Sequence, residues 1–113
     1  MRPWTIYLSG PISRDPDYRE KFARAERLLR SLSHRQNGIY IINPAVRHPV
    51  GLSNAEYARL SLSEIDACQD VCLLPGWEDS DGASLEFAYA TYIGKPTWQL
   101  EDRFPDWMEA GES

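Results

Sequence analysis

The chain has 113 residues, of which 42% are hydrophobic and 26% charged, an ordinary globular mixture that excludes a disordered protein. Its formal net charge of -5 argues against a protein that wraps nucleic acid, because phosphate contacts need clustered Lys and Arg. No signal peptide, long apolar span or lipidation motif is found, so we expect a cytoplasmic protein that does not bind membranes. We expect one domain over residues 1–113, with an acidic tail from about residue 101.

The chain begins with a predicted strand and a predicted helix. Residues 4–8 form a short β-prone run that ends at the small-residue turn 9–11. Asp15 suits the N-cap of a helix, and Pro16 suits its first position. Apolar side chains then recur at helical spacing as far as Leu32, which predicts a long amphipathic helix.

A second strand and a second long helix are predicted next. Residues 39–42 are an apolar run of strand length, and prolines then favour an irregular loop over residues 45–52. Ser53 and Glu56 match a capping box, in which each side chain accepts a hydrogen bond from the other residue's backbone N–H. The helix that they open should run to about Cys68.

Strand and helix alternate again through the rest of the chain. Residues 71–74 predict a third buried strand, which is followed by a polar loop at 77–81. A third helix is expected from about 82 to 93, and a fourth strand at residues 97–100. We expect a short turn of helix at residues 105–109.

This order of elements predicts the fold class. Strands that are continuous apolar runs favour a parallel sheet covered on both faces. The alternation of strand and helix predicts an α/β, three-layer, doubly wound sandwich with a mainly parallel four- or five-stranded sheet, flavodoxin-like or Rossmann-like. Ligands bind such folds beyond the carboxyl ends of the strands, so Ser9, Gly10, Asn43 and residues 75–77 should border one pocket.

Glu86 is the candidate catalytic residue. It is the only charged residue between Gly82 and Gly94, so the helix that carries it should be largely buried. A lone carboxylate there is costly to desolvate unless it is paired or faces a cavity, and a place near the start of the helix should keep it ionised. The residues alone support two interpretations equally: a nucleophile or general base at the floor of a pocket, and a capping or salt-bridged glutamate.

Two turns are candidate anion sites. Free backbone amides in the turn 9–11 could hold a phosphate, with side-chain contacts from Ser13 or Arg14, although a tight turn without a ligand is the favoured interpretation. The loop 80–82, at the start of the third helix, could supply a second contact by the same logic.

Aromatic and histidine side chains give weaker signals. Tyr7 and Trp77 lie near expected strand ends, where a base or sugar could stack on them, but aromatics in such places more often border the core. His34 and His48 lie in polar, loop-like segments, and we expect both on the surface rather than in a catalytic site.

The cysteines do not indicate a metal or redox site. Cys68 and Cys72 do not have the two-residue gap of such motifs, and no histidine is near enough in the sequence to complete a set of four ligands. We expect two buried apolar side chains and no bound metal.

Three segments together resemble a known family. These are YLSGPIS after the first strand, Asn43-Pro44, and LLPGWEDSDGASLEFAYATYIGKP, in which a Gly is followed four residues on by Glu86 and then by small residues and Gly-Lys-Pro. They are similar to the nucleoside 2-deoxyribosyltransferase-like family, and above all to its short, phage-type members. The resemblance covers about residues 5–98.

The resemblance implies an activity and a set of site residues. Characterised members cleave the N-glycosidic bond of 2'-deoxynucleosides or nucleotides and pass the sugar to another base or to water. It implies that Glu86 is the nucleophile, that no metal or organic cofactor is needed, and that the partner is a nucleoside or nucleotide rather than a nucleic acid polymer. It also implies a homodimer or higher homo-oligomer. The substrate-binding residues expected from the resemblance and the predicted fold are Tyr7, Ser9, Gly10, Ile12, Asn43, Ser61, Trp77, Ser80 and Gly82.

One position departs from the family's pattern. Members carry an aspartate on the helix before the third strand, where it helps to position the nucleoside and assists the leaving base, and Ser61 stands there in this chain. Glu64, one turn on, is a candidate substitute. Two hypotheses follow: an N-glycosidase or deoxyribosyltransferase in which another group protonates the base, and a non-catalytic protein that binds or sequesters nucleotides in the same pocket. A third is a flavodoxin-like interaction module without a small ligand.

Overall fold

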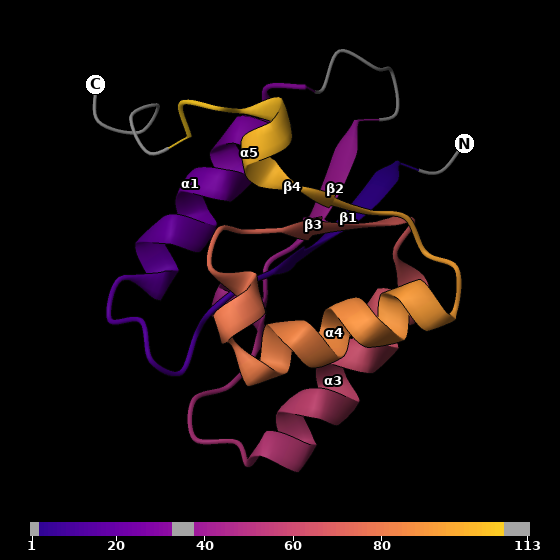
Figure 1. Ribbon diagram of the computed structural model, residues 1–113. Helices are drawn as coiled ribbons and strands as arrows, with labels where there is room; N and C mark the ends of the chain where they lie inside the picture. Colours follow the sequence, from indigo (N-terminus) through magenta and orange to yellow (C-terminus); the bar gives the residue numbers. More distant parts are fainter. Residues whose placement is uncertain (1–2, 33–37, 108–113) are drawn as a thin grey trace.

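A four-stranded parallel sheet forms the centre of the computed structural model, which describes residues 3–32 and 38–107 (Figure 1). In sheet order its strands are β2 (Ile39–Ile42), β1 (Trp4–Ser9), β3 (Asp70–Leu73) and β4 (Thr97–Gln99). All three strand pairs are parallel, and Ile6 of β1 lies between Ile41 of β2 and Asp70 of β3. The chain goes from β1 to β2 on one side and returns to β3 on the other, which makes the β1–β3 boundary the topological switch point.

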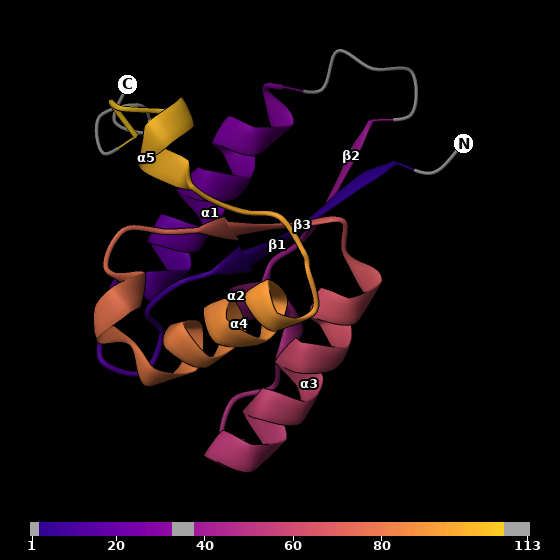
Figure 2. The ribbon, with the colours of Figure 1, turned by 45° about the vertical axis from the view of Figure 1, so that its right-hand side comes forward.

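Helices cover both faces of this sheet, so the predicted three-layer, doubly wound α/β fold is confirmed. Helices α1 (Tyr18–Arg30) and α5 (Leu100–Arg103) lie on one face, and α3 (Asn54–Ala67) and α4 (Asp81–Tyr92) lie on the other (Figure 2). The short helices α2 (Pro44–Arg47) and η1 (Trp77–Asp79) belong to the connections that follow β2 and β3. No helix of the described ranges is long and apolar enough to span a bilayer.

Each face has its own buried core. Successive side chains of a strand point to opposite faces, so β1 sends Ile6 and Leu8 towards α1, and Tyr7 and Ser9 towards α3 and α4. The core on the α1 side contains Ile6, Leu8, Phe22, Leu29, Cys72 and Leu74, and that on the other side Tyr7, Ile42, Ile65, Val71, Leu73 and Ala90.

Three element boundaries differ from the predictions. Helix α1 begins at Tyr18 with Asp17 as its N-cap, two residues later than the predicted N-cap Asp15. Asp15 lies before the helix, where its carboxylate accepts the N–H of Asp17 and forms an ion pair with Lys21 of the first turn. A helical turn, α2, occupies part of the predicted loop 45–52, since the Asn43 side chain caps it. A further short helix, α5, directly follows β4 and was not predicted. Residues 105–107 form a turn, within the range predicted as 105–109, and 108–109 lie outside the described residues.

The helices of the other face follow the prediction in extent but not in burial. The capping box of α3 is confirmed, with reciprocal hydrogen bonds between Ser53 and Glu56. Helix α4 has the expected bounds to within one residue, but only Ala83 and Ala90 of it are buried, and Tyr92 is 90% exposed. The expectation that this apolar helix is largely buried is therefore wrong.

Candidate active site

A pocket of about 620 Å³ lies beyond the carboxyl end of β1, between α3 and α4. Its walls come from the loop 10–14 after β1, from both ends of α2, and from Leu52 and the first half of α3. Residues 79–83 and 85–86, around the start of α4, complete them. Its volume is within the range of small-molecule sites, and its place beside the switch point of the sheet is where ligands bind in such folds.

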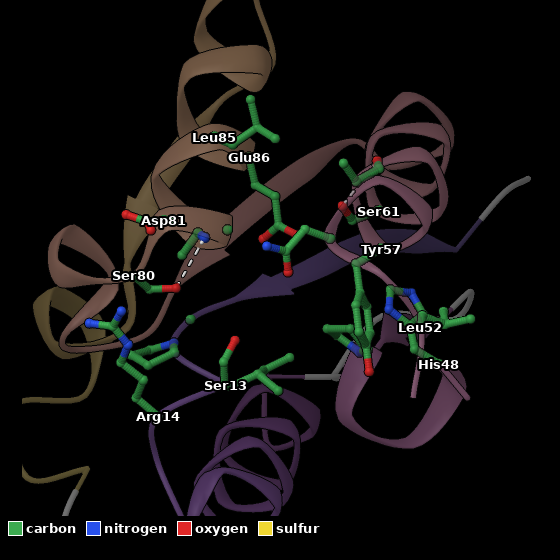
Figure 3. Close-up of a pocket in the computed structure, with 18 of the residues that line it drawn as sticks. Ser13, Arg14, His48, Leu52, Tyr57, Ser61, Ser80, Asp81, Leu85 and Glu86 are labelled. Carbon is green, nitrogen blue, oxygen red and sulfur yellow. Dashed lines mark hydrogen bonds between the residues drawn. The ribbon is translucent and has the colours of Figure 1, made fainter. Parts of the chain in front are cut away.

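The Glu86 carboxylate lies at the floor of this pocket (Figure 3). The Ser9 hydroxyl donates a hydrogen bond to its Oε1 at 2.6 Å, and the Tyr7 hydroxyl donates one to its Oε2 at 3.0 Å. Both donors come from β1, two residues apart, so the strand's alternation presents them to the same carboxylate. No Lys, Arg or His of the described chain lies within ion-pair distance of Glu86, which disfavours the salt-bridged interpretation.

Burial raises the pKa of the Glu86 carboxyl above the ordinary glutamate range. Hydrogen bonds from Ser9 and Tyr7, the nearby Ser61 hydroxyl and the charge of His48 lower this pKa, but they do not outweigh the desolvation. The expectation that the helix dipole keeps the group ionised is not borne out by this direction, because Glu86 is the sixth residue of α4 and the dipole acts mainly within the first turn.

Tyr7 serves as a fixed donor to this carboxylate. Its side chain is fully buried, and burial together with the negative charge of Glu86 raises the pKa of its phenol well above the usual value. The phenol is therefore protonated at neutral pH and donates its hydrogen bond to Glu86.

One end of the pocket is formed by the start of α4 and by the loop after β1. Ser80 caps α4, where its Oγ accepts the N–H of Ala83 at 3.3 Å, and Arg14 lies beside Ser80 and Asp81 (Figure 3). A Cβ added at Gly82 would meet nothing within 4 Å, so this backbone is open to a ligand. Asp79 and Asp81 bring negative charge to the same end.

Gly10 is required by packing. A Cβ added there would lie 2.8 Å from the Cβ of Leu74, which is closer than real side chains approach. The glycine thus lets the end of β1 lie against Leu74, the residue that follows β3, on the side of the sheet that faces α1.

The structure brings most of the predicted site residues to the pocket wall: Tyr7, Gly10, Ile12, Ser61, Ser80, Gly82 and Glu86. Three others lie elsewhere. Ser9 is buried beneath the pocket against Glu86; Asn43 caps α2 and donates to Glu26; and Trp77 packs on Phe87, with ring centroids 4.6 Å apart. Ser9 and Asn43 thus contact the protein rather than the pocket space.

The prediction that His48 is a surface residue is wrong. Its side chain is only 5% exposed and lines the pocket, because Glu64 of α3 binds its Nε2 at 2.5 Å and the Tyr57 ring lies 5.9 Å from its own. These partners are distant in sequence, so the polar surroundings of His48 gave no sign of its burial. His34 lies outside the described residues.

Tyr57 was also missed by the sequence reasoning. It shares one face of α3 with Ser61 and Glu64, at spacings of four and three residues. That spacing is visible in the sequence and could have placed Tyr57 beside the position of Ser61.

Ser61 lies at the pocket wall, where α3 contributes no carboxylate. It is 3% exposed, and its hydroxyl donates to the carbonyl of Ala58 at 3.3 Å. Glu64 does not replace the expected aspartate in the pocket wall. The Glu64 carboxylate binds His48 instead, and also Arg47 at 3.0 Å.

The cysteines are buried, as predicted. Burial raises the pKa of the Cys68 thiol to about 12 and raises that of Cys72 as well, so neither is a reactive thiolate. Within residues 3–32 and 38–107, no group of three or more His, Cys, Asp or Glu side chains is arranged to hold a metal ion.

Comparisons with known proteins show the fold and the family. A solved structure of a 2-desoxiribosyltransferase from Leishmania mexicana is similar to this chain with a TM-score of 0.61 at 22% sequence identity. The likeness covers 86% of this chain and 63% of that one, so this chain matches less than two thirds of the other's length. A search of curated proteins found no match. The model of the family described as "domain of unknown function (DUF4406)" matches residues 4–98, and the chain therefore belongs to that family.

Proposed function

We propose that this protein cleaves the N-glycosidic bond of a (deoxy)nucleoside or nucleoside 5'-monophosphate, with the Glu86 carboxylate as the nucleophile. One observation carries the proposal: a carboxylate without a cationic partner among the described residues is held by two hydroxyl groups at the floor of a pocket of about 620 Å³. The fold, shared with a protein named as a 2-desoxiribosyltransferase, supports a nucleoside as the substrate class.

In the proposed reaction a Glu86 oxygen attacks C1' of the sugar as the base departs. The transition state is oxocarbenium-like, and the product is a glycosyl ester on Glu86. Water or a second base then attacks C1' and releases the carboxylate. The hydroxyl groups of Ser9 and Tyr7 fix both oxygens of Glu86, which places the carboxylate for attack before the substrate binds.

The end of the pocket formed by Arg14, Ser80 and Gly82 is the proposed site of the 5' substituent. A phosphate there would gain the Arg14 charge and the open backbone at Gly82, against the negative charge of Asp79 and Asp81. The relative kcat/KM for a nucleoside and its 5'-monophosphate measures this balance. A preference for the monophosphate that is lost in Arg14→Ala supports the phosphate, and a preference for the free nucleoside contradicts it.

Release of free base from a panel of nucleosides and 5'-monophosphates tests the activity itself. The wild type should release base from at least one substrate, and Glu86→Gln should not, while circular dichroism shows that both are folded. Equal rates in the two proteins would overturn the assignment of the nucleophile.

The second candidate function is nucleotide binding without catalysis. It is favoured by Ser61, whose hydroxyl bonds to a backbone carbonyl where the resemblance leads one to expect a carboxylate. Tight binding with no base release over long incubation, unchanged in Glu86→Gln, would select this function.

A homo-oligomer is proposed on the same resemblance. Leu85, Tyr92 and Ile93 of the α4 region are exposed apolar side chains, as an interface between copies would use. Light scattering coupled to size exclusion should give a mass of two or more chains, and a monomer at all concentrations would contradict it.

A further inference from the structure

His48 stands at the opposite end of the pocket from the proposed phosphate site. Figure 3 shows His48, Tyr57 and Leu52 together on one side, Arg14, Ser80 and Asp81 on the other, and Glu86 between them. A substrate with its 5' substituent near Ser80 and C1' near Glu86 therefore directs its base towards His48. The ring of Tyr57 and the side chain of Leu52 suit a flat, partly apolar base at that end.

Glu64 fixes the orientation of the His48 ring. Its Oε1 lies 2.5 Å from Nε2 of His48, and its Oε2 lies 3.0 Å from Nε of Arg47, so one carboxylate holds two consecutive residues at the end of α2. A carboxylate bound at Nε2 keeps a proton on that nitrogen, which leaves Nδ1 as the nitrogen that exchanges its proton with a ligand. Within residues 3–32 and 38–107, Nδ1 of His48 has no hydrogen-bond partner.

Other acids of the pocket are less suited to the same task. The Tyr7 hydroxyl donates to Glu86, and the Tyr57 hydroxyl donates to the carbonyl of Pro49. Asp81 lies beside Ser80, at the end away from His48 (Figure 3), and Asp79 directly precedes Ser80 in the chain.

Resting on the proposed function, we propose that His48 is the general acid that protonates the leaving base, with Glu64 as the residue that positions it. Ser61 of α3 has no acidic group with which to protonate the base. The His48 ring, at the end of α2, supplies the proton instead.

The step balances without any further reactant. As the C1'–N bond breaks and the C1'–O bond to Glu86 forms, the electron pair stays on the base, which takes the proton from Nδ1 of the His48 imidazolium. Neutral His48 then accepts a proton from the water, or from the N–H of the incoming base, that attacks C1' and displaces Glu86. The cycle ends with His48 and Glu86 in their starting protonation states.

A substrate whose leaving group needs no proton isolates this step. 4-Nitrophenyl 2-deoxyribofuranoside 5-phosphate releases a stable anion, whereas a nucleoside 5'-monophosphate must release a protonated base. For His48→Asn we expect the single-turnover rate of base release from the best nucleotide to fall by about 10²–10⁴-fold. The single-turnover rate of nitrophenolate release, which does not include the later attack of water on C1', should change by less than about threefold. His34→Asn, which removes the other histidine of the chain, is the matched control.

Three further measurements separate acid catalysis from a structural role. Imidazole added to His48→Gly should restore base release from the nucleotide, and Glu64→Gln should show the same selectivity for the nitrophenyl substrate to a smaller degree. The fall of nucleotide kcat/KM at high pH should vanish in His48→Asn. The charged and titratable groups that face His48 are Glu64, Arg47, Tyr57 and Glu86.

The outcomes distinguish this proposal from the function on which it rests. If the wild type releases neither base nor nitrophenolate, or if Glu86→Gln is as active as the wild type, the proposed function is wrong and this proposal falls with it. If the wild type is active and Glu86→Gln is not, two results overturn the role of His48 alone. These are equal losses in the single-turnover release of base and of nitrophenolate in His48→Asn, and no rescue of base release by imidazole.

Discussion

The two faces of the sheet share strand β1, yet they differ in what they bury. On one face Ile6 and Leu8 pack against α1 in a continuous apolar core. On the other, Tyr7 and Ser9 turn two hydroxyl groups towards the carboxylate of Glu86. Because side chains alternate between the two faces of a strand, β1 packs Ile6 and Leu8 into an apolar core and directs Tyr7 and Ser9 to the Glu86 carboxylate.

This difference separates stability from function within a few residues. The apolar face gains free energy from burial. The polar face buries a carboxylate whose pKa is raised by desolvation, which costs stability whenever the group is ionised. Changes to the apolar side chains that pack with Ile6 and Leu8 should therefore act on unfolding, and changes to Glu86 and its hydroxyl donors should act on the reaction.

The largest effect is expected for Glu86→Gln. Without the nucleophile, base release should fall by at least about 10³-fold. The folded-state pKa of Glu86 is raised, so wild-type stability declines as pH rises through the window between its unfolded and folded pKa values, and the variant lacks this decline. The unfolding free energy of Glu86→Gln relative to wild type, measured in urea at pH 4 and pH 8, should increase with pH, and a decrease would contradict the burial cost.

A change on the apolar face should have the opposite profile. Leu29 of α1 is fully buried in the core between this helix and the sheet. Leu29→Ala should lower the free energy of unfolding by about 2–5 kcal/mol. Below the melting temperature its kcat should stay within about threefold of wild type. Urea unfolding and base-release rates measure both, and a large loss of kcat in folded protein would break the separation of the faces.

Tyr7→Phe should give a smaller effect, which is expected mainly on the pH dependence of the reaction. It removes one of the two hydroxyl donors to Glu86, and this donor lowers the pKa of the carboxyl, so that pKa should rise further. The acid limb of the kcat profile should move to higher pH, with a stability change of about 1 kcal/mol. If the acid limb of the kcat profile lies at the same pH in Tyr7→Phe as in the wild type, Glu86 does not act as a carboxylate.

The smallest effect is expected for Ser53→Ala, which removes a cap from the helix that carries Ser61 and Glu64. Loss of the hydrogen bond that the Ser53 Oγ accepts from the N–H of Glu56 should cost about 0.5–2 kcal/mol of stability. Since Ser53 lies at the solvent-exposed start of α3, turnover should not change. A change in turnover would show that the start of α3 is coupled to the pocket.

The sequence predicted the parts of the fold that depend on local patterns. Four strands and three long helices follow from apolar runs and periodicity, and the Ser53–Glu56 capping box follows from side chains three residues apart. The start of α1 was misplaced because Asp15 and Asp17 are both suitable caps, and the pairing of Asp15 with Lys21 decides between them.

The candidate site was predictable only where the residues lie on the predicted elements. Glu86 stood out because it is the only charge in its helix, and its neighbours Tyr7 and Ser9 lie at the end of a predicted strand. The burial of His48 depends on Glu64, sixteen residues away, in a contact that no local pattern contains. Tertiary pairing of this kind is what sequence reasoning lacked.

The most direct test of the central claim is to trap the sugar on Glu86. A 2'-fluoro-arabinosyl nucleoside 5'-monophosphate slows the second step, and peptide mass spectrometry then locates the adduct. We expect one sugar phosphate on the peptide that contains Glu86 for each base released in the first turnover. Base release with that peptide unmodified throughout would contradict it.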